Sequence, residues 1–280
     1  MKKRKEVVAI TGGCGRIGSA LAEDLLKLGY KVLLGDINKN KLIKFKNKSK
    51  SPNIEIFFGD LTIKKNIDSF ITFGLKKFGK IDSVVCCSYP VSKGWGARFE
   101  HLKENFLKED LYKQLGATII FCQRIIKYFL KLKKGNLILI SSVQGIQAPK
   151  FEHYPDSKMS SPIEYSAIKS GIISVSRYLS KYYKNKNIRV NCVSPGGIKD
   201  NQPNLFIKRY RKSCNSKGLL DGKDISKLTP QDRVKEGISF VPQTRNVFTG
   251  LSVQENLEMG AYLREENPTE IIHEIFELFP

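Results

Sequence analysis

The sequence lacks the cysteine spacings of common metal sites and disulfide frameworks, and it lacks apolar runs long enough to span a membrane. Its 280 residues include six cysteines and no C-x-x-C pair, the spacing on which many zinc sites and redox motifs are built. No segment approaches the ~20 apolar residues of a membrane-spanning helix, and the apolar run behind the basic N-terminus, "VVAIT", is too short for a signal peptide. We therefore expect a cytoplasmic protein without a metal site and without membrane insertion.

Acidic residues are also scarce, because 27 aspartates and glutamates face 48 lysines and arginines, a net charge of +21. Lysine carries most of the excess and is scattered among asparagine and isoleucine, as in "NKNKLIKFKNKSK" at residues 38–50. The arginine and aromatic interleaving of nucleic-acid-binding surfaces is missing. We interpret the charge as solvated lysine on helix faces and loops, and we do not expect nucleic acid as a partner.

Short apolar runs alternate with longer amphipathic segments as far as about residue 195. Six runs have the length and composition of buried strands, at residues 7–11, 31–36, 54–60, 82–88, 136–142 and 188–194. This alternation predicts an α/β fold, a doubly wound parallel sheet of the Rossmann type. After "SPGG" at residues 194–197 the pattern changes, and we expect a boundary between a domain at 1–220 and a second segment at 221–280.

A glycine-rich turn, "GGCGRIG", joins the first predicted strand to the first helix. Gly12, Gly15 and Gly18 permit positive φ and close approach of the backbone to a pyrophosphate, whose charge a helix N-terminus favours. A glycine triplet alone is also compatible with an ordinary tight turn. This one lies between a strand and a helix, and Asp36 ends the second strand about twenty residues later, where a ribose-binding acid is expected. The sequence therefore predicts a dinucleotide site.

Asp36 also indicates which dinucleotide binds. Its carboxylate would accept hydrogen bonds from the ribose 2′-hydroxyl and repel a 2′-phosphate, which favours NAD over NADP. Either Arg16, in the glycine-rich turn, or Lys39, three residues after Asp36, would neutralise such a phosphate, so NADP stays the weaker alternative. Asp60, after the third strand, is expected either to reach the adenine amino group or to cap the following helix.

The pattern Y-x-x-x-K occurs three times, beginning at Tyr154, Tyr165 and Tyr182. On a helix this spacing places tyrosine and lysine on one face, where the ammonium lowers the pKa of the phenol and lets it act as general acid or base. Tyr154 precedes a proline, and Tyr182 lies where the helical pattern ends. Tyr165 opens a long helical pattern after Pro162, so Tyr165 and Lys169 are the predicted catalytic pair.

Four motifs resemble those of the short-chain dehydrogenase/reductase family in order and spacing, over residues ~5–220: "ITGGCGRIG", "ILISS", "EYSAIKSGI" and "IRVNCVSPGG". The resemblance implies hydride transfer between NAD(P) and a carbonyl/alcohol pair on a small-molecule substrate. It also implies that Tyr165 is the acid/base, that Lys169 binds the nicotinamide ribose, and that Ser142 binds the substrate oxygen.

Further residues follow from the same resemblance. Alignment on "LGA" places Gln114 where the family has a catalytic asparagine, while Cys86, Cys87, Ser88 and Tyr89 replace the usual Asn-Asn-Ala-Gly. Pro195 and Gly196 are expected either to border the nicotinamide or only to form a turn. The residues implied to contact the cofactor are Gly12, Gly15, Arg16, Ile17, Gly18, Asp36, Asp60, Leu61, Lys169, Pro195, Gly196 and Ile198.

The connection between Ser142 and Tyr165 is longer than usual in the family, and we expect it to face the substrate. His153 within it is expected to be an exposed loop residue, with a substrate contact as the alternative. This insertion, together with "SYP" after the fourth strand and "SPGGIKDNQP" after the sixth, resembles a subgroup found in flagellin-modification and nonulosonic-acid pathways. That resemblance implies an amino sugar or a sugar nucleotide as the substrate.

From about residue 221 the sequence resembles another family. The segment beginning "DGKDISKLTPQDRVKEG" is similar to the Q-loop region of a branched-chain amino acid ABC transporter ATPase, with Gln243 as the Q-loop glutamine. The chain contains no G-x-x-x-x-G-K-S/T phosphate loop and no L-S-G-G-Q signature. ATP hydrolysis is therefore not expected.

The dehydrogenase family continues with a seventh parallel strand that contributes to subunit packing, and this chain is expected to lack its native version. "GISFV" at residues 237–241 is a candidate replacement, and a homo-oligomer, although expected of the family, is doubtful for this chain. Three accounts stay open. The chain is a working dehydrogenase with an incidental tail, a catalytically impaired chimera that only binds dinucleotide, or a cofactor-binding regulator.

Overall fold

The computed structural model describes residues 6–154, 160–213, 252–261 and 269–278, together with residues 219, 229, 232, 238–239 and 267. By its contacts the chain divides into two units, Met1–Ser194 and Pro195–Pro280, and each is described by itself. The predicted boundary near residue 220 falls among residues outside the described ranges and stays a prediction.

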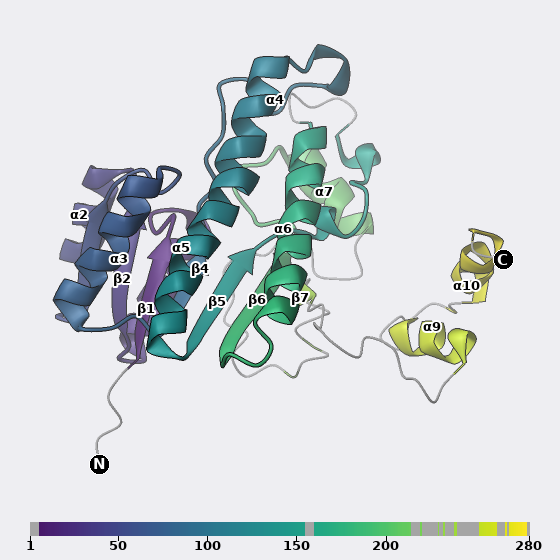
Figure 1. Ribbon diagram of the computed structural model, residues 1–280. Helices are drawn as coiled ribbons and strands as arrows, with labels where there is room; N and C mark the ends of the chain where they lie inside the picture. Colours follow the sequence, from purple (N-terminus) through teal and green to yellow (C-terminus); the bar gives the residue numbers. More distant parts are fainter. Residues whose placement is uncertain are drawn as a thin grey trace. The chain divides into compact units, whose positions relative to one another are not determined.

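The first unit is built on a parallel sheet (Figure 1). Its strands are β1 (Val7–Thr11), β2 (Lys31–Asp36), β3 (Ile54–Phe58), β4 (Ser83–Cys86), β5 (Gly135–Ile140) and β6 (Ile188–Pro195). They lie in the order β3-β2-β1-β4-β5-β6, and all neighbours are parallel. The six predicted strands and the Rossmann-type fold are confirmed, and every strand end lies within two residues of its predicted position.

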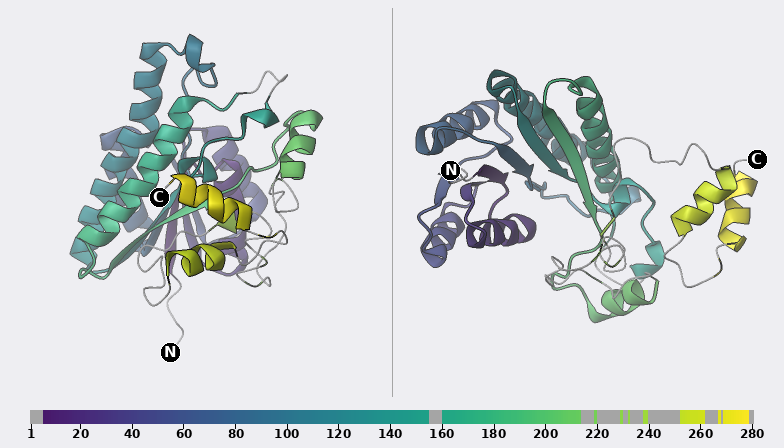
Figure 2. Two further views of the ribbon diagram at one scale, coloured as in Figure 1. Left: turned by 90° about the vertical axis from the view of Figure 1, so that its right-hand side faces the viewer. Right: turned by 90° about the horizontal axis from the view of Figure 1, so that it is seen from below.

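Helices cover both faces of this sheet. One face carries α1 (Arg16–Lys27) and α2 (Lys39–Ser49), and the other carries α3 (Lys64–Phe78), α5 (Ala117–Leu132) and α6 (Ile163–Tyr182). Figures 1 and 2 show the sheet between these two layers. The shorter elements of the unit are η1 (Phe99–His101), α4 (Glu104–Asp110), η2 (Leu111–Gly116), η3 (Val143–Gly145) and η4 (Phe151–His153).

The alternation of side chains along each strand explains the two layers. In β1, Val8 and Ile10 belong to the apolar cluster that includes Ala22 of α1, whereas Ala9 belongs to the cluster that includes Phe70 of α3. Successive residues of a strand point to opposite faces, and both faces of β1 are buried. A strand in this position therefore reads as a continuous apolar run.

The strand order reverses between β1 and β4. In a doubly wound sheet, connections leave in opposite directions at such a point and open a crevice at the carboxyl ends of the strands. The loops that follow β1, β4 and β5 all begin at this edge, so residues from distant parts of the sequence meet there.

The described part of the second unit contains α7 (Asn204–Ser213), the two-residue strand β7 (Ile238–Ser239), α9 (Val253–Ala261) and α10 (Thr269–Leu278). α10 packs against α9. Gln243 and most of the segment that resembles an ABC ATPase lie outside the described residues, so that resemblance stays a prediction. The replacement of the seventh strand by residues 237–241 also stays a prediction. Across the described parts of both units, no helix has the length and apolar character needed to cross a bilayer.

Candidate active site

The connection between β1 and α1 brings backbone amides to the carboxyl edge of the sheet. Gly12 has φ +61°, and a Cβ there would lie 2.6 Å from the carbonyl oxygen of Cys87, so glycine is needed where β1 passes the end of β4. A Cβ on Gly18 would lie 2.4 Å from the Gly12 carbonyl oxygen. α1 begins at Arg16 with Gly15 as N-cap, without a side-chain cap or an acidic residue in its first turn. Such a helix end suits an anion.

The carboxylate of Asp36, at the end of β2, faces this loop. Its Oδ2 accepts a hydrogen bond from the Cys14 backbone N at 2.8 Å, and its Oδ1 accepts one from the Asn38 backbone N at 2.8 Å. Burial, with the negative charge of Asp36, raises the pKa of the Cys14 thiol to about 11. Asp36 is partly exposed, so the carboxylate is fixed in position and still accessible to a ribose hydroxyl.

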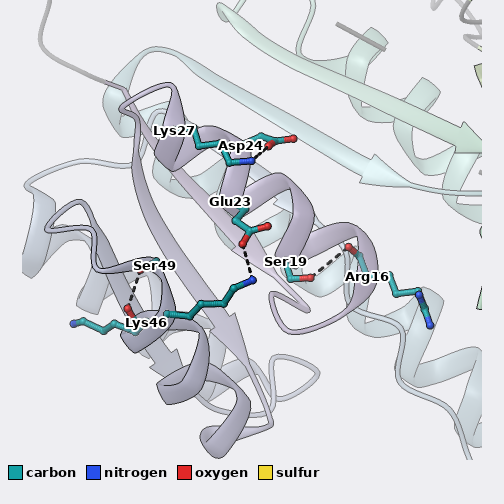
Figure 3. A network of polar contacts seen from close by, with 8 residues as sticks. Arg16, Ser19, Glu23, Asp24, Lys27, Lys46 and Ser49 are labelled. Atoms are coloured by element: carbon teal, nitrogen blue, oxygen red, sulfur yellow. Dashed lines mark hydrogen bonds and ion pairs between the residues drawn. The ribbon is translucent and has the colours of Figure 1, made fainter. Parts of the chain in front are cut away.

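Arg16 and Ile17 open α1 beside the loop. Figure 3 shows the Arg16 side chain directed away from the exposed ion pair by which Lys48 of α2 contacts Glu23 of α1, 3.0 Å apart. Arg16 is exposed and Ile17 is partly buried, while Lys39 is the first residue of α2. The Arg16 side chain therefore takes no part in the ion pair between Lys48 and Glu23.

Asp60 follows β3 and organises the turn that leads to α3. Its Oδ1 accepts hydrogen bonds from the Thr62 backbone N at 2.9 Å and the Thr62 hydroxyl at 2.7 Å. α3 has Ile63 as its N-cap, so Asp60 caps the preceding turn and not the helix itself, and the adenine contact stays a prediction. The side chain of Leu61 belongs to the core cluster and is 9% exposed.

Tyr165 and Lys169 lie on one face of α6, as predicted. α6 begins at Ile163, directly after Pro162, and the Nζ of Lys169 lies 5.5 Å from the centroid of the Tyr165 ring. Lys169 is 6% exposed, and its Nζ donates a hydrogen bond to the carbonyl oxygen of Ile140 at 3.1 Å. Burial lowers the pKa of Lys169 to about 8.

The two serines that end the β5 region hold this face of α6. Ser141 donates a hydrogen bond from its hydroxyl to the carbonyl oxygen of Lys169 at 2.7 Å, and the Ser142 Oγ accepts one from the Gln144 backbone N at 3.2 Å. Burial raises the pKa of Tyr165, and hydrogen bonding to Ser142 opposes that effect. The expectation of a lowered tyrosine pKa is therefore wrong for this structure, because desolvation of the phenol outweighs the groups that favour phenolate.

Gln114 lies in η2, a π-helical turn that joins α4 to α5 without a break. It is 3% exposed, and neither its Oε1 nor its Nε2 has a hydrogen-bond partner among the described residues. π-helical turns inside α-helices frequently occur at functional sites, and η2 packs against α6. A buried amide of this kind is suited to bind a water or a ligand.

The other two Y-x-x-x-K candidates lack this environment. Tyr182 is the last residue of α6 and is 67% exposed. Tyr154 follows η4, a 3₁₀ turn, and its partner Lys158 lies outside the described residues. His153 is 7% exposed, so the expectation of an exposed loop histidine is wrong, and burial lowers its pKa.

Pro195, Gly196 and Ile198 belong to the second unit. Pro195 ends β6, the Gly197 backbone N donates a hydrogen bond to the Tyr210 hydroxyl at 2.8 Å, and the Ile198 carbonyl oxygen accepts one from Gln202. These contacts involve the residues that follow Gly196, so the turn-forming interpretation of Pro195 and Gly196 stays a prediction. The nicotinamide contact stays a prediction.

Two aromatic residues of the loop after β4 lie beside Tyr165. The Tyr89 ring centroid is 5.9 Å and the Trp95 ring centroid 6.1 Å from that of Tyr165. The sequence singled out Tyr89 as a departure from the family pattern but did not indicate Trp95. The available signal was a tryptophan, the only one in the chain, placed soon after the carboxyl end of a strand that borders the crevice.

Comparisons with known proteins agree with this geometry. The family profile described as short chain dehydrogenase matches residues 6–205. The post-translational flagellin modification protein A of Campylobacter coli is 41% identical over 226 residues, which cover 79% of this chain and 88% of that protein. A 3-oxoacyl-acyl-carrier-protein reductase of Rickettsia felis is 29% identical over 248 residues, 88% of this chain and 93% of its own. Because 88% of the chain is more than residues 1–220 contain, this alignment extends beyond the predicted boundary at residue 220.

A solved structure supports the same assignment. The short chain dehydrogenase of Leptospira borgpetersenii, determined with bound NAD⁺, is 27% identical, has a TM-score of 0.70, and is matched over 79% of this chain and 83% of its own. The family match alone covers well over half of the chain. The chain therefore belongs to the short-chain dehydrogenase family and is an oxidoreductase of that family.

Proposed function

We propose that the chain transfers hydride between NAD and a carbonyl/alcohol pair, with Tyr165 as the proton donor and acceptor. The observation that carries this proposal is the environment of Lys169. An ammonium has three N–H donors, and among the described residues the buried Nζ makes a single hydrogen bond, to Ile140, beside the Tyr165 ring. Such a group is suited to bind the hydroxyls of a ribose.

The residues of the first unit fit a dinucleotide. A Cβ on Gly12 would collide with backbone, and Gly12, Gly15 and Gly18 carry no side chain to obstruct a ligand, so the amides of the α1 N-terminus, with Arg16 and Ile17, would hold the pyrophosphate. The remaining first-unit contacts of the proposal are the ribose at Asp36, the adenine at Asp60 and Leu61, and the nicotinamide ribose at Lys169. The resemblance to the family adds Pro195, Gly196 and Ile198 of the second unit as expected nicotinamide contacts.

When bound, the nicotinamide supplies the hydride acceptor or donor. Tyr165 moves the proton at the substrate oxygen, and Ser142 binds that oxygen through its hydroxyl. Because its pKa is raised, Tyr165 is protonated at neutral pH and is ready to donate a proton in the direction of carbonyl reduction. Lys169 contributes positive charge next to the ring, and Gln114 would hold a water through which the proton reaches solvent.

NAD is favoured over NADP for an electrostatic reason. Both oxygens of Asp36 already accept backbone hydrogen bonds, so the carboxylate is held near the loop and cannot turn away from a 2′-phosphate. A phosphate there would face the fixed negative charge of Asp36, which costs free energy in a partly buried site and outweighs the help of Arg16 and Lys39 in this proposal.

We further propose that the substrate is an amino sugar or a sugar nucleotide. Two lines support this: the resemblance of residues 143–164 and of "SYP" to the flagellin-modification subgroup, and the 41% identity to the Campylobacter coli protein, which is named for flagellin modification. In this proposal residues 221–280 take no part in the chemistry. Three further predictions accompany this proposal: a division of the chain near residue 220, the likeness of residues 221–280 to an ABC ATPase, and a homo-oligomer.

Calorimetric titration of the full chain with NAD⁺ and NADP⁺, followed by NADH formation from a panel of UDP-linked amino sugars, tests the proposal. We expect tighter binding of NAD⁺ and NADH formation from at least one sugar nucleotide. Failure to bind either dinucleotide would refute the dehydrogenase assignment. Binding of NAD⁺ without turnover of any alcohol or carbonyl would favour the chimera that only binds the cofactor.

A further inference from the structure

Three aromatic rings meet at the carboxyl edge of the sheet. Tyr89 and Trp95 come from the loop after β4, and Tyr165 comes from α6. The three centroid distances are 5.6, 5.9 and 6.1 Å, and the rings cross at 81° to 90°. No pair is stacked face to face, and Tyr89 is 47% exposed. The side chains therefore form an aromatic corner with accessible surface next to the proposed proton donor. We call Tyr89 and Trp95 the aromatic wall.

The loop that carries the aromatic wall is anchored by a buried carboxylate. Asp110 is fully buried, and its Oδ1 and Oδ2 accept hydrogen bonds from the backbone N and the hydroxyl of Ser92, each at 2.6 Å. Further along, the Ser160 hydroxyl donates a hydrogen bond to the carbonyl oxygen of Gly96. Trp95 is thus held between two fixed points. Burying a carboxylate costs free energy unless its oxygens accept hydrogen bonds. The two hydrogen bonds from Ser92 meet this need and fix the loop beside the reaction centre.

Tyr89 reaches the reaction centre by a second contact. The Nζ of Lys169 lies 5.2 Å from the centroid of the Tyr89 ring and 5.5 Å from that of Tyr165. A cation at this distance from an aromatic ring is attracted to the ring's negative face. Tyr89 and Tyr165 therefore share one ammonium, and a substrate oxygen hydrogen-bonded to Tyr165 and Ser142, as in the proposed function, would lie next to the aromatic wall.

We propose that Tyr89 and Trp95 bind the pyranose ring of the substrate and determine the enzyme's specificity for sugars. The proposal rests on the proposed function and names the part of that site that selects the substrate. One face of a pyranose presents C–H groups, which pack on the negative faces of aromatic rings, while its hydroxyls remain available to polar partners such as Ser142. An acyclic polyol has no such ring face, and a ring with a single hydroxyl, such as cyclohexanol, offers far fewer groups to the polar partners.

Trp95 supplies the direct assay, because it is the only tryptophan in the chain. The Tyr165→Phe variant, saturated with NAD⁺, keeps the third ring and slows turnover enough for binding to be measured. We expect its tryptophan emission to change saturably with UDP-N-acetylglucosamine and not with xylitol or cyclohexanol. An equal change with cyclohexanol would mean a general site for apolar rings, and no change with the sugar nucleotide would mean that the wall does not bind sugars. Either result would overturn the proposal.

Kinetics provide the second readout. Trp95→Ala and Tyr89→Ala should raise KM for the sugar by about tenfold or more with little change in kcat, because the wall binds the ring equally before and in the transition state. Trp95→Phe and Tyr89→Phe should restore most of the affinity, and Phe99→Ala, 71% exposed on η1 of the same segment, is the matched control. Unchanged KM in both alanine variants would contradict the proposal. If the wild-type chain did not bind NAD⁺, the proposed function would be contradicted instead. Failure of the sugar-binding proposal and failure of the proposed function are therefore distinguishable.

Discussion

The ammonium of Lys169 donates its hydrogen bond to the carbonyl oxygen of Ile140, 3.1 Å away at the end of β5. This contact joins the central helix of the site to the sheet, and it leaves a positive charge buried beside two phenol rings. The folded chain therefore holds the Lys169 proton less tightly than the unfolded chain does, as the lowered pKa of about 8 indicates.

Replacing Lys169 by methionine should stabilise the free protein while abolishing activity. Below about pH 8 the wild-type lysine is charged in both the folded and the unfolded chain, and the folded chain bears the full cost of burying it. As pH rises above that value the unfolded chain retains more protons, so wild-type stability increases and the advantage of the variant shrinks. We expect a gain on the order of 2 kcal/mol near neutral pH.

Thermal unfolding of the wild-type chain and of Lys169→Met, measured from roughly pH 6.5 to pH 9.5, checks this expectation. This pH range is centred on the lowered pKa of Lys169. The exposed Lys181 lies on the same helix, and Lys181→Met should show no such pH-dependent difference. A variant at Lys169 that is equally destabilised at every pH would contradict the account of a costly buried charge.

The glycine-rich loop should tolerate alanine at Gly12 poorly, for two separable reasons. The positive φ of +61° strains any L-residue by about 1–2 kcal/mol, and the new Cβ would lie 2.6 Å from the Cys87 carbonyl oxygen. Gly79 also has positive φ, +78°, but a Cβ there meets no atom of the described residues within 4 Å. Gly79→Ala should thus cost only the strain, and Gly12→Ala at least about 1 kcal/mol more. Equal losses in chemical denaturation would show that the close approach of β1 and β4 has no energetic weight.

Much of this architecture was predictable because its signals are local. The apolar runs marked all six strands, and Pro162 indicated where α6 begins and therefore which tyrosine shares a helix face with a lysine. The π-helical turn around Gln114, the burial of His153 and the contact of Trp95 with Tyr165 were not predictable. Each depends on the packing of segments far apart in the chain, to which composition and periodicity are blind.

The preference for NAD should depend on the charge of Asp36. Asp36→Asn removes the negative charge and keeps one acceptor oxygen, so only one of the backbone amides of Cys14 and Asn38 retains its partner. Affinity for NAD⁺ should fall by roughly tenfold, since a hydrogen bond to a charged group contributes about 1.5–3 kcal/mol, and affinity for NADP⁺ should rise relative to it. Asp24→Asn, on the exposed side of α1, should change neither. An unchanged ratio of the two dissociation constants in calorimetry would contradict the electrostatic argument.

The central claim, that Tyr165 carries the proton, is tested most directly by comparing Tyr165→Phe with Tyr182→Phe on the same helix. Both tyrosines belong to a Y-x-x-x-K pattern, but Tyr165 lies beside the buried Lys169 and Tyr182 is 67% exposed. With a turned-over sugar nucleotide, we predict that Tyr165→Phe lowers kcat by about 10²-fold or more with NAD⁺ affinity within about threefold of wild type, and that Tyr182→Phe matches wild type. Equal turnover by Tyr165→Phe and the wild-type chain would contradict the account.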